Sequence, residues 1–327
     1  AGSFDDGLEA EKRLDSYEAR DCFHKALKEN PDAPGVAEHT AWFLFLNGFH
    51  DEECLMLLRQ AGPKGQDPEA MERAARMVER ELGLRGPADE KEKAEQKAFQ
   101  KMKVEQAASG TDAERGGSLV DAGEVAEGVV LLEKAVKEAP GDEVLELKLT
   151  RAYFWSGKKA EADQAYDRLL EKHPGNPALL LERAQVAISR EDDEKARTLL
   201  TAAEKARPGD SRILLERSRM ESMEYNREAA LEAVDRMSPQ EQESARAWLA
   251  RGRADHSRGQ FAAATESYEK ALAKAPHLEE AAHRLAECRV WRGHYGAADE
   301  LISDWMSRER GFDWSERTEL YAQMTDP

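Results

Sequence analysis

Histidine and cysteine side chains are the residues of this chain best suited to catalysis or metal binding, and their spacing supports neither. His50 and Cys54 lie four residues apart and would supply two metal ligands from one helix face, but no second pair completes a closed site. His283 and Glu287 form a similarly incomplete pair. The sequence contains no HExxH, no G-x-S-x-G and no glycine-rich phosphate-binding loop. We therefore predict a protein that is not an enzyme and that uses no metal and no cofactor.

Arginine and tryptophan side chains recur at matched positions and are the better candidates for binding. Arg151, Arg219 and Arg253 occupy one equivalent position of a repeated pattern. Guanidinium groups in such a row would form a basic stripe that holds carboxylates in forked geometry, unless they pair with neighbouring Glu and Asp. Trp155 and Trp291 precede turn glycines at corresponding positions. Exposed indoles would stack on a sugar ring or anchor a partner's side chain, and packing between repeats is the alternative.

A repeat of 34 residues is the pattern that must position these side chains. Pro140, Pro174, Pro208 and Pro276 keep this period, the last after a double step. A fixed period of this length predicts pairs of helices joined by a turn, stacked one pair on the next. The repeats so defined are 109–142, 143–176, 177–210, 211–244, 245–278 and 279–312.

Small residues stand where the two helices of each repeat turn and meet. Gly157, Gly259 and Gly293 mark the turn, where a left-handed backbone ends the first helix at least steric cost. In repeat 211–244 the dipeptide Tyr225-Asn226 replaces the glycine, and the early Pro239 predicts a shortened second helix. A recurring alanine near the start of the second helix would allow close approach of two helix backbones: Ala162, Ala196, Ala230, Ala264 and Ala298.

The N-terminal third follows the same plan less regularly. We predict degenerate helical repeats in 1–86, a charged helical connector in 87–108, and a regular array in 109–327 that ends in a capping segment after Trp305. The connector is rich in Lys, Glu and Gln, which predicts a mostly exposed helix. The segment 83–87, Gly-Leu-Arg-Gly-Pro, is the clearest break in the helical pattern.

The repeated pattern resembles the tetratricopeptide repeat, most closely over 109–312. The resemblance implies an all-α fold, a right-handed α-solenoid of antiparallel helix pairs whose concave face is lined mainly by first helices. Such domains usually bind peptides, partner proteins or, less often, polymers. Helix periodicity then selects the residues expected on the concave face. These are Arg151, Phe154, Trp155, Gln185, Arg219, Arg253, His256 and Trp291.

A second set of arginines recurs where this family usually has an apolar core residue: Arg183, Arg217 and Arg251. The pairs Arg217–Glu221 and Arg251–Asp255 have the four-residue spacing of ion pairs within a helix. We expect these arginines to make structural contacts between repeats.

Two short stretches resemble a narrower group. Ala152-Tyr-Phe-Trp-Ser-Gly157 and Cys288-Arg-Val-Trp-Arg-Gly293 look like the aromatic-then-glycine turns of periplasmic repeat domains in bacterial exopolysaccharide export machines. The resemblance implies a periplasmic scaffold that holds a modifying enzyme near the exit pore. The alternatives are a module that directly binds a cationic amino-sugar polymer, and a cytosolic adaptor for a peptide.

Composition limits the partners further. The formal net charge of −18 repels a phosphate backbone, so we expect no nucleic acid among the partners. The same charge favours cationic partners, or serves solubility alone. No apolar run is long enough for a transmembrane helix within this chain. The chain begins Ala-Gly-Ser without an initiator Met, so we expect a processed or excised sequence in which a signal peptide would not be visible.

Overall fold

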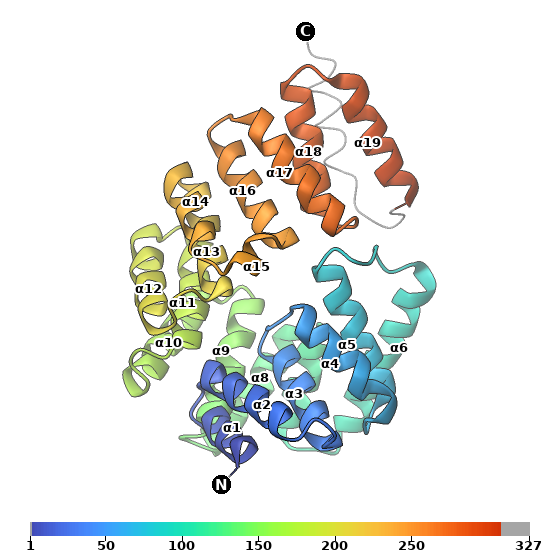
Figure 1. Cartoon of the computed structure of the whole chain (residues 1–327). Coiled ribbons are helices and arrows are strands. Elements are labelled where there is room, and N and C mark those ends of the chain that lie inside the picture. The colour runs from blue at the N-terminus through green and yellow to red at the C-terminus, as the bar shows by residue number, and fades with distance from the viewer. Residues whose placement is uncertain (1, 309–327) are drawn as a thin grey trace. The chain divides into compact units, whose positions relative to one another are not determined.

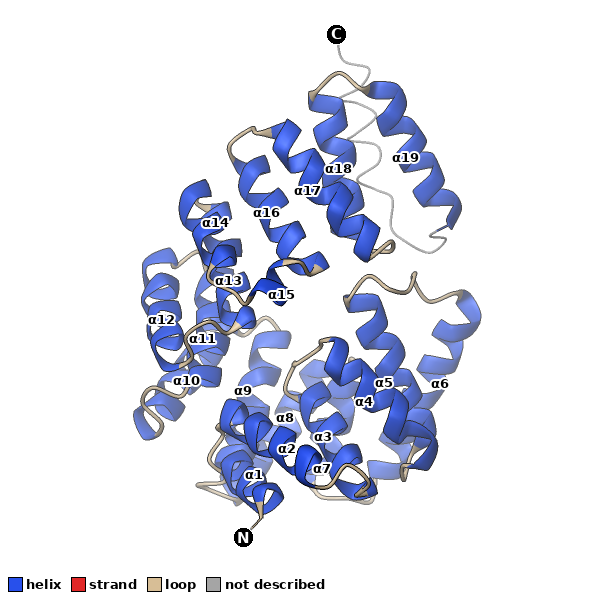
Figure 2. Cartoon of the chain, in the orientation of Figure 1, coloured by secondary structure: helices blue, strands red, loops and turns tan. Residues whose placement is uncertain are grey.

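The computed structural model describes residues 2–308, and every regular element in this range is a helix (Figures 1 and 2). The all-α prediction is confirmed, and the predicted repeats lie where the 34-residue period places them. The first helices are α7 (Asp112–Asp121), α9 (Glu143–Trp155), α11 (Pro177–Ser189), α13 (Ser211–Met223), α16 (Ala245–Ser257) and α18 (Glu279–Trp291). The second helices are α8 (Val125–Glu138), α10 (Lys159–Lys172), α12 (Asp193–Ala206), α14 (Arg227–Asp235), α17 (Phe261–Lys274) and α19 (Tyr295–Arg308).

Capping residues set where the first helices begin. The side chains of Asp142, Asn176, Asp210 and Ser244, each one repeat after the last, accept hydrogen bonds from backbone N–H groups in the first turn of α9, α11, α13 and α16. These N–H groups have no partner inside the helix, so each cap satisfies donors that would otherwise be unpaired. The recurring cap keeps the helix starts one repeat apart.

The turn after each of the helices α9, α11, α13, α16 and α18 contains one residue in the left-handed conformation. Gly157, Gly259 and Gly293 have φ of 79°, 69° and 74°, as predicted. Glu191 and Tyr225 stand at the equivalent positions of the two remaining repeats and adopt φ of 60° and 59° despite their side chains. The packing of the helix pair therefore imposes this backbone conformation, and glycine only makes it less costly.

Close packing within the repeats follows the predicted small residues. The alanines expected at the helix contacts, Ala162, Ala196, Ala230, Ala264 and Ala298, are all fully buried. On α16, Gly252 leaves the space that the ring of Tyr268 occupies. The shortened second helix of repeat 211–244 is also confirmed, because α14 ends at Asp235 and a separate turn of helix, α15 (Pro239–Gln242), follows.

The chain divides into two compact units. Unit 1 comprises Ala1–Val36 and Lys91–Pro208, and unit 2 comprises Ala37–Glu90 and Gly209–Pro327. The predicted division at 86 and 108 describes how regular the repeats are along the chain, and it stays a prediction. Each compact unit instead contains one N-terminal segment and one part of the later array. The N-terminal elements are α1 (Ser3–Lys12), α2 (Ser16–Glu29), α3 (Pro34–Leu46), α4 (Glu52–Ala61), the 3₁₀ helix η1 (Gly62–Lys64), α5 (Pro68–Glu81) and α6 (Glu90–Ala107).

In unit 1 the first helix pair packs on the array. Leu14, in the turn between α1 and α2, belongs to a buried cluster with Tyr166 of α10 and Leu179 of α11. The guanidinium of Arg207 donates hydrogen bonds of 2.8 and 3.1 Å to the carboxylate of Asp21. Apolar burial therefore supplies the contact, and the ion pair orients it.

In unit 2 the segment from α3 to α5 packs on later helices. The guanidinium carbon of Arg212 on α13 lies 4.3 Å from the ring centroid of Phe49. The backbone N–H of His277 donates a 2.8 Å hydrogen bond to the carbonyl oxygen of Gly83. The predicted break at 83–87 is thus confirmed as a non-helical segment, since α5 ends at Glu81 and α6 begins at Glu90, but its first residue is held in place.

The remaining sequence predictions concern α6, the cap and the membrane. Helix α6 has no buried residue, in agreement with the mostly exposed helix predicted there, and its role as a connector stays a prediction. The capping segment predicted after Trp305 lies, beyond residue 308, outside the described residues. Among the residues that the structure describes, no helix is both long enough and apolar enough to cross a bilayer.

Candidate binding site

Exposed tryptophans at the ends of first helices are the most distinctive surface feature. Trp155 is the last residue of α9 and is 60% exposed, and Trp291 is the last residue of α18 and is 63% exposed. Met223 ends α13 at an equivalent position and is 54% exposed. The predicted alternative, burial of these indoles between repeats, does not occur.

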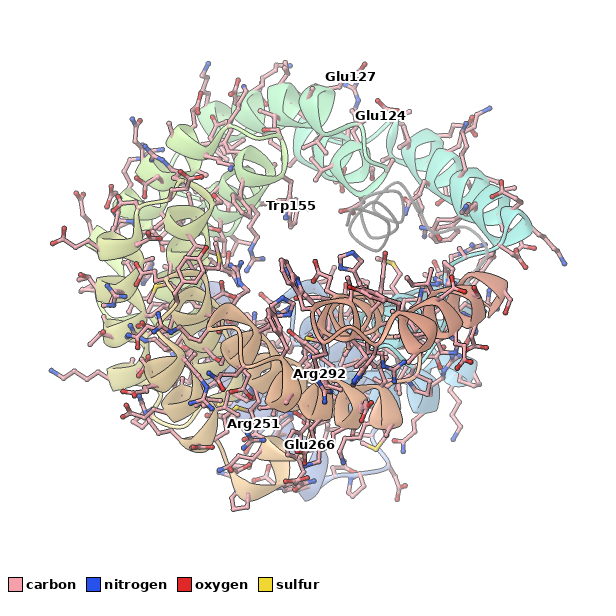
Figure 3. The ribbon with its side chains drawn as sticks, turned by 90° about the horizontal axis from the view of Figure 1, so that it is seen from above. Glu124, Glu127, Trp155, Arg251, Glu266 and Arg292 are labelled. Atoms are coloured by element: carbon pink, nitrogen blue, oxygen red, sulfur yellow. The ribbon has the colours of Figure 1, made fainter. Side chains whose placement is uncertain are left out.

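The two indoles have different surroundings. The ring of Trp291 stacks on that of Phe261, the first residue of α17, with centroids 5.8 Å apart and planes inclined by 5°. Trp155 points away from the neighbouring helices of unit 1 (Figure 3). Its neighbour Phe154 packs instead against the buried cluster of α10 and α11. The indole of Trp291 is therefore supported by a second aromatic ring, whereas Trp155 makes no ring contact with another described residue.

The predicted arginine stripe is occupied by ion pairs. Arg151 makes two hydrogen bonds of 2.9 and 2.8 Å to Glu182 on the next first helix, and the hydroxyl of Tyr166 donates to the same carboxylate at 2.7 Å. Burial by itself would lower the pKa of Arg151. The charge and hydrogen bonds of Glu182 outweigh burial and raise the pKa of Arg151 above its ordinary value. The guanidinium therefore stays charged and serves to join α9 to α11.

The other two arginines of the stripe also have acidic partners. Arg253 on α16 pairs with Glu280 on α18 through a 2.6 Å hydrogen bond from Nε and a second contact from Nη2. Burial raises the pKa of Glu280, yet the hydrogen bond and charge of Arg253 lower it overall. Arg219 pairs with Glu216 on its own helix. The structure thus shows the alternative interpretation, pairing with neighbouring carboxylates, and binding by these arginines stays a prediction.

His256 lies in a polar contact near the end of α16. Its Nδ1 is 3.6 Å from the sulfur of Cys288, and its Nε2 is 3.9 Å from a carboxylate oxygen of Glu287. Burial lowers the pKa of His256 and raises the pKa of Cys288 to about 12. Both groups are therefore neutral near pH 7, which disfavours a nucleophilic thiolate. Gln185, the remaining predicted residue, is half-buried on α11.

In the second set of arginines, Arg183 makes the predicted contact between repeats, whereas the ion pair of Arg217 with Glu221 lies within one helix. Arg183 pairs with Asp163 at 3.3 Å and with Asp167, both on the preceding helix α10. The spacing of Arg217 and Glu221 does give an ion pair, with N···O 3.5 Å.

For Arg251 the predicted partner is wrong. Its guanidinium donates to the carbonyl oxygen of Gln242 at 2.7 Å and contacts Asp235 at 3.3 Å. The expected partner Asp255 accepts instead a 2.6 Å hydrogen bond from Arg227. The shortened second helix of repeat 211–244 brings these alternative acceptors close to Arg251.

His50 and Cys54, the incomplete metal-ligand pair, make structural contacts instead. His50 contacts Glu81 at 2.5 Å through Nδ1 and the carbonyl oxygen of Phe45 at 2.8 Å through Nε2. Cys54 is fully buried, and burial raises its pKa to about 12. Within residues 2–308, no group of three or more His, Cys, Asp or Glu side chains has an arrangement that would hold a metal ion.

Sequence reasoning missed the charged residues around Trp291. Arg258 and Arg292 are the first residues of the turns after α16 and α18, and both are exposed. Tyr295, the first residue of α19, is 48% exposed. The recurring Arg-Gly dipeptide in these turns is the sequence signal for these arginines, although its glycine by itself predicts only a helix end.

The fold and these surfaces define an α-helical repeat protein. Models of the tetratricopeptide repeat match residues 119–172 and 256–323, and a second model of the same repeat matches 147–211. The chain therefore carries tetratricopeptide repeats and has the all-α solenoid architecture of such repeats. Proteins of this kind typically mediate protein–protein interactions and are generally not catalytic. No curated protein sequence matches this chain.

Several solved structures share the fold. A tetratricopeptide repeat protein from Parabacteroides merdae ATCC 43184 is 19% identical, with a TM-score of 0.55 over 68% of this chain and 84% of that chain. A chain of the APC/C hetero-tetramer Cut9–Hcn1 is 12% identical, with a TM-score of 0.56 over 95% of this chain and 59% of that chain. PilW, a type IV pilus biogenesis factor, is 19% identical, with a TM-score of 0.50 over 55% of this chain and 84% of that chain. Likeness at such low identity shows the fold alone.

Proposed function

We propose that this protein is a non-catalytic scaffold that binds a partner protein through its first-helix surfaces, with Trp155 and Trp291 as principal anchors. The observation that carries the proposal is that both tryptophans end first helices at equivalent positions, four repeats apart, and both are more than half exposed. Tryptophan is enriched among the few residues that carry most of the binding energy at protein interfaces. An array that buries Tyr166 and Tyr268 in its core but exposes these two indoles is suited to partner binding.

A finer proposal concerns the partner and the compartment. The aromatic-then-glycine turns at Trp155 and Trp291 support a place in a bacterial exopolysaccharide export system of the periplasm, where the scaffold holds a modifying enzyme near the exit pore. The full-length gene product tests this directly. A cleaved signal peptide together with recovery in the periplasmic fraction is the expected result. A leaderless cytosolic product would overturn the finer proposal in favour of the cytosolic peptide-binding adaptor.

Partner capture tests the scaffold itself. The chain is immobilised, and the protein that it recovers from its native cells is identified, purified and titrated against the wild type, Trp155→Ala and Trp291→Ala. Truncation of an anchoring tryptophan costs about 2 kcal/mol, so each variant is expected to raise Kd by about 30-fold.

Val130→Ala is the matched control for the partner titration. Val130 is 62% exposed but lies on α8, a second helix, so its loss is expected to leave Kd unchanged. Equal affinities of both tryptophan variants and the wild type would contradict the proposal.

A direct polymer-binding module is the second candidate, because exposed indoles also stack on sugar rings and the net charge of −18 attracts a cationic chain. The probe is a partly deacetylated amino-sugar oligomer in calorimetry. Binding that weakens steeply with salt and is lost in Trp155→Ala would favour this reading over the scaffold. Absence of heat, together with stoichiometric capture of one protein, would exclude it.

A further inference from the structure

Two arginines in unit 2 differ from the one other arginine at the same position of a repeat turn. Arg258 and Arg292 occupy equivalent positions in consecutive repeats, and among residues 2–308 neither side chain makes an ion pair or a hydrogen bond. Arg190 stands at the same position of an earlier repeat, and its guanidinium contacts Asp163 at 2.9 Å. In a chain with 66 acidic and 48 basic residues, most arginines have a carboxylate within reach, so two unpaired guanidinium groups in adjacent turns require an explanation.

Arg190 finds its carboxylate 27 residues earlier, on the preceding second helix, and the corresponding positions for Arg258 and Arg292 are the uncharged Leu231 and Thr265. The two turns read Arg258-Gly-Gln and Arg292-Gly-His, and the helices that follow begin Phe-Ala-Ala-Ala and Tyr-Gly-Ala-Ala. The corresponding turn after α11 reads Arg190-Glu-Asp-Asp-Glu. Asp255, three residues before Arg258, is buried and accepts a 2.6 Å hydrogen bond from Arg227. An exposed guanidinium without a paired carboxylate gives a small positive region on a protein whose overall field is negative.

An aromatic surface adjoins these charges. Arg292 directly follows Trp291, and Arg258 lies three residues before Phe261, on which the indole of Trp291 stacks. Arg292 is marked at its turn in Figure 3. The aromatic pair is thus bracketed along the chain by the two unpaired arginines. Trp155, at the equivalent position of unit 1, is followed by Ser156 and has no such arginine.

We propose that the turns after α16 and α18 form a docking site for an acidic segment of the partner protein. Carboxylates of that segment pair with the forked guanidinium groups of Arg258 and Arg292, and an apolar side chain beside them packs on Trp291. The inference rests on the proposed scaffold function and names the chemistry of its partner. Tryptophan and arginine are the residue types most enriched among interface anchors, and this site combines them.

The charge of the whole protein explains why this site would be selective. An acidic segment is repelled by most of a surface with net charge −18, so only a region with unpaired arginines attracts it and fixes its register. A long phosphate backbone would meet the same repulsion along its whole length, which disfavours nucleic acid at this site. A short acidic peptide needs only the two guanidinium groups and the indole.

Peptide titration tests the inference on the whole chain. The probe is a short fluorescein-labelled peptide that alternates leucine with glutamate and aspartate, followed by fluorescence anisotropy. Loss of one charge-assisted hydrogen-bonded pair corresponds to about a tenfold change, so Arg258→Gln and Arg292→Gln are each expected to raise Kd about tenfold. Trp291→Ala is expected to raise Kd by at least as much, and raising the ionic strength from about 0.05 M to about 0.5 M weakens the wild-type complex.

The controls keep the test specific. Arg168→Gln removes an exposed arginine from α10 and is expected to leave Kd unchanged. A peptide with lysine in place of the acidic residues is expected not to bind. All these positions are exposed, so the variants are expected to retain the melting temperature of the wild type.

Three results would each overturn the inference: no binding of the acidic peptide, equal binding of the lysine peptide, or Kd values unaffected by both arginine substitutions. Preferential binding of a uronate oligosaccharide would overturn it as well, in favour of a sugar acid. The partner titration described above remains a separate measurement. If Trp291→Ala still weakens binding of the partner protein but the acidic peptide does not bind, the proposed scaffold function is retained. Only the proposal of an acidic docking segment is then rejected.

Discussion

The side-chain amide of Asn176 donates a 2.9 Å hydrogen bond to the carbonyl oxygen of Leu14, 162 residues earlier in the chain. The same side chain caps α11, because its Oδ1 accepts hydrogen bonds from the backbone N–H groups of Ala178 and Leu179. Asn176 is buried, so its loss would leave the Leu14 carbonyl and the helix N-terminus unsatisfied at once. One residue thus joins the N-terminal helix pair to the array within unit 1.

Asn176→Ala is therefore expected to destabilise unit 1 by about 3 kcal/mol, from the lost cap and the unsatisfied buried carbonyl together. The measurement is the free energy of unfolding in urea. Asp142→Ala removes the equivalent cap of α9, which accepts only from Leu145, and is expected to cost about 1 kcal/mol. Equal losses in the two variants would show that the contact with Leu14 contributes nothing.

Tyr225→Gly is expected to stabilise the protein. Tyr225 has φ of 59°, and its side chain is 66% exposed, so the substitution relieves left-handed strain while giving up little burial. The steric cost of this conformation for a residue with a Cβ is about 1 kcal/mol, which sets the expected gain. Gly259→Ala, at the equivalent turn, is expected to lose a similar amount. Thermal melts of both variants check the signs, and a lower melting temperature for Tyr225→Gly would refute the argument.

Removal of Arg151 is expected to affect stability more than removal of Arg219, although both were predicted on one face. Arg151→Met breaks two charge-assisted hydrogen bonds to Glu182 in a largely buried setting, at a cost of about 2 kcal/mol. Arg219→Met breaks a more exposed pair within one helix and is expected to cost less than about 1 kcal/mol. Urea unfolding measures both. Should Arg151→Met lower partner affinity without lowering stability, its role is ligand binding after all.

The stability of unit 2 is expected to depend on the protonation of His50. Burial lowers the pKa of His50, but the hydrogen bond and charge of Glu81 outweigh burial and raise it above its ordinary value. A raised pKa means that the folded state binds the proton more tightly, so this contribution is fully present below about pH 6.5 and is lost as the pH rises through the folded-state pKa. His50→Gln is expected to remove this part of the pH dependence.

Urea midpoints measured from about pH 5 to about pH 8.5 span the titration of His50 in both states. Glu81→Gln is the matched control, since it removes the partner and should give the same flattening. A wild-type midpoint that falls on acidification through this range, with both variants flat, would contradict the assigned sign.

The repeat positions could be predicted from sequence because they depend on local contacts. The glycine turns, the buried alanines and the short α14 follow from steric preferences of nearby residues, and each lies where expected. The partner of Arg251 could not be predicted in this way. The interruption after α14 moves Gln242 and Asp235 within reach, and four-residue spacing takes no account of neighbouring repeats.

Of the candidate site, the sequence selected Trp155 and Trp291 from their matched positions before turn glycines but left open whether they are exposed or packed between repeats, and the structure shows both exposed. The pairing of Arg151 with Glu182 and the unpaired state of Arg258 and Arg292 depend on which carboxylates lie within about 4 Å in space. The docking of Leu14 beside Asn176 likewise joins residues with no sequence relationship. The sequence by itself determined the helix pairs, since their period is local and repeated. Only the tertiary structure decided which charges are paired and where the N-terminal helices pack, because these depend on non-local contacts that no period encodes.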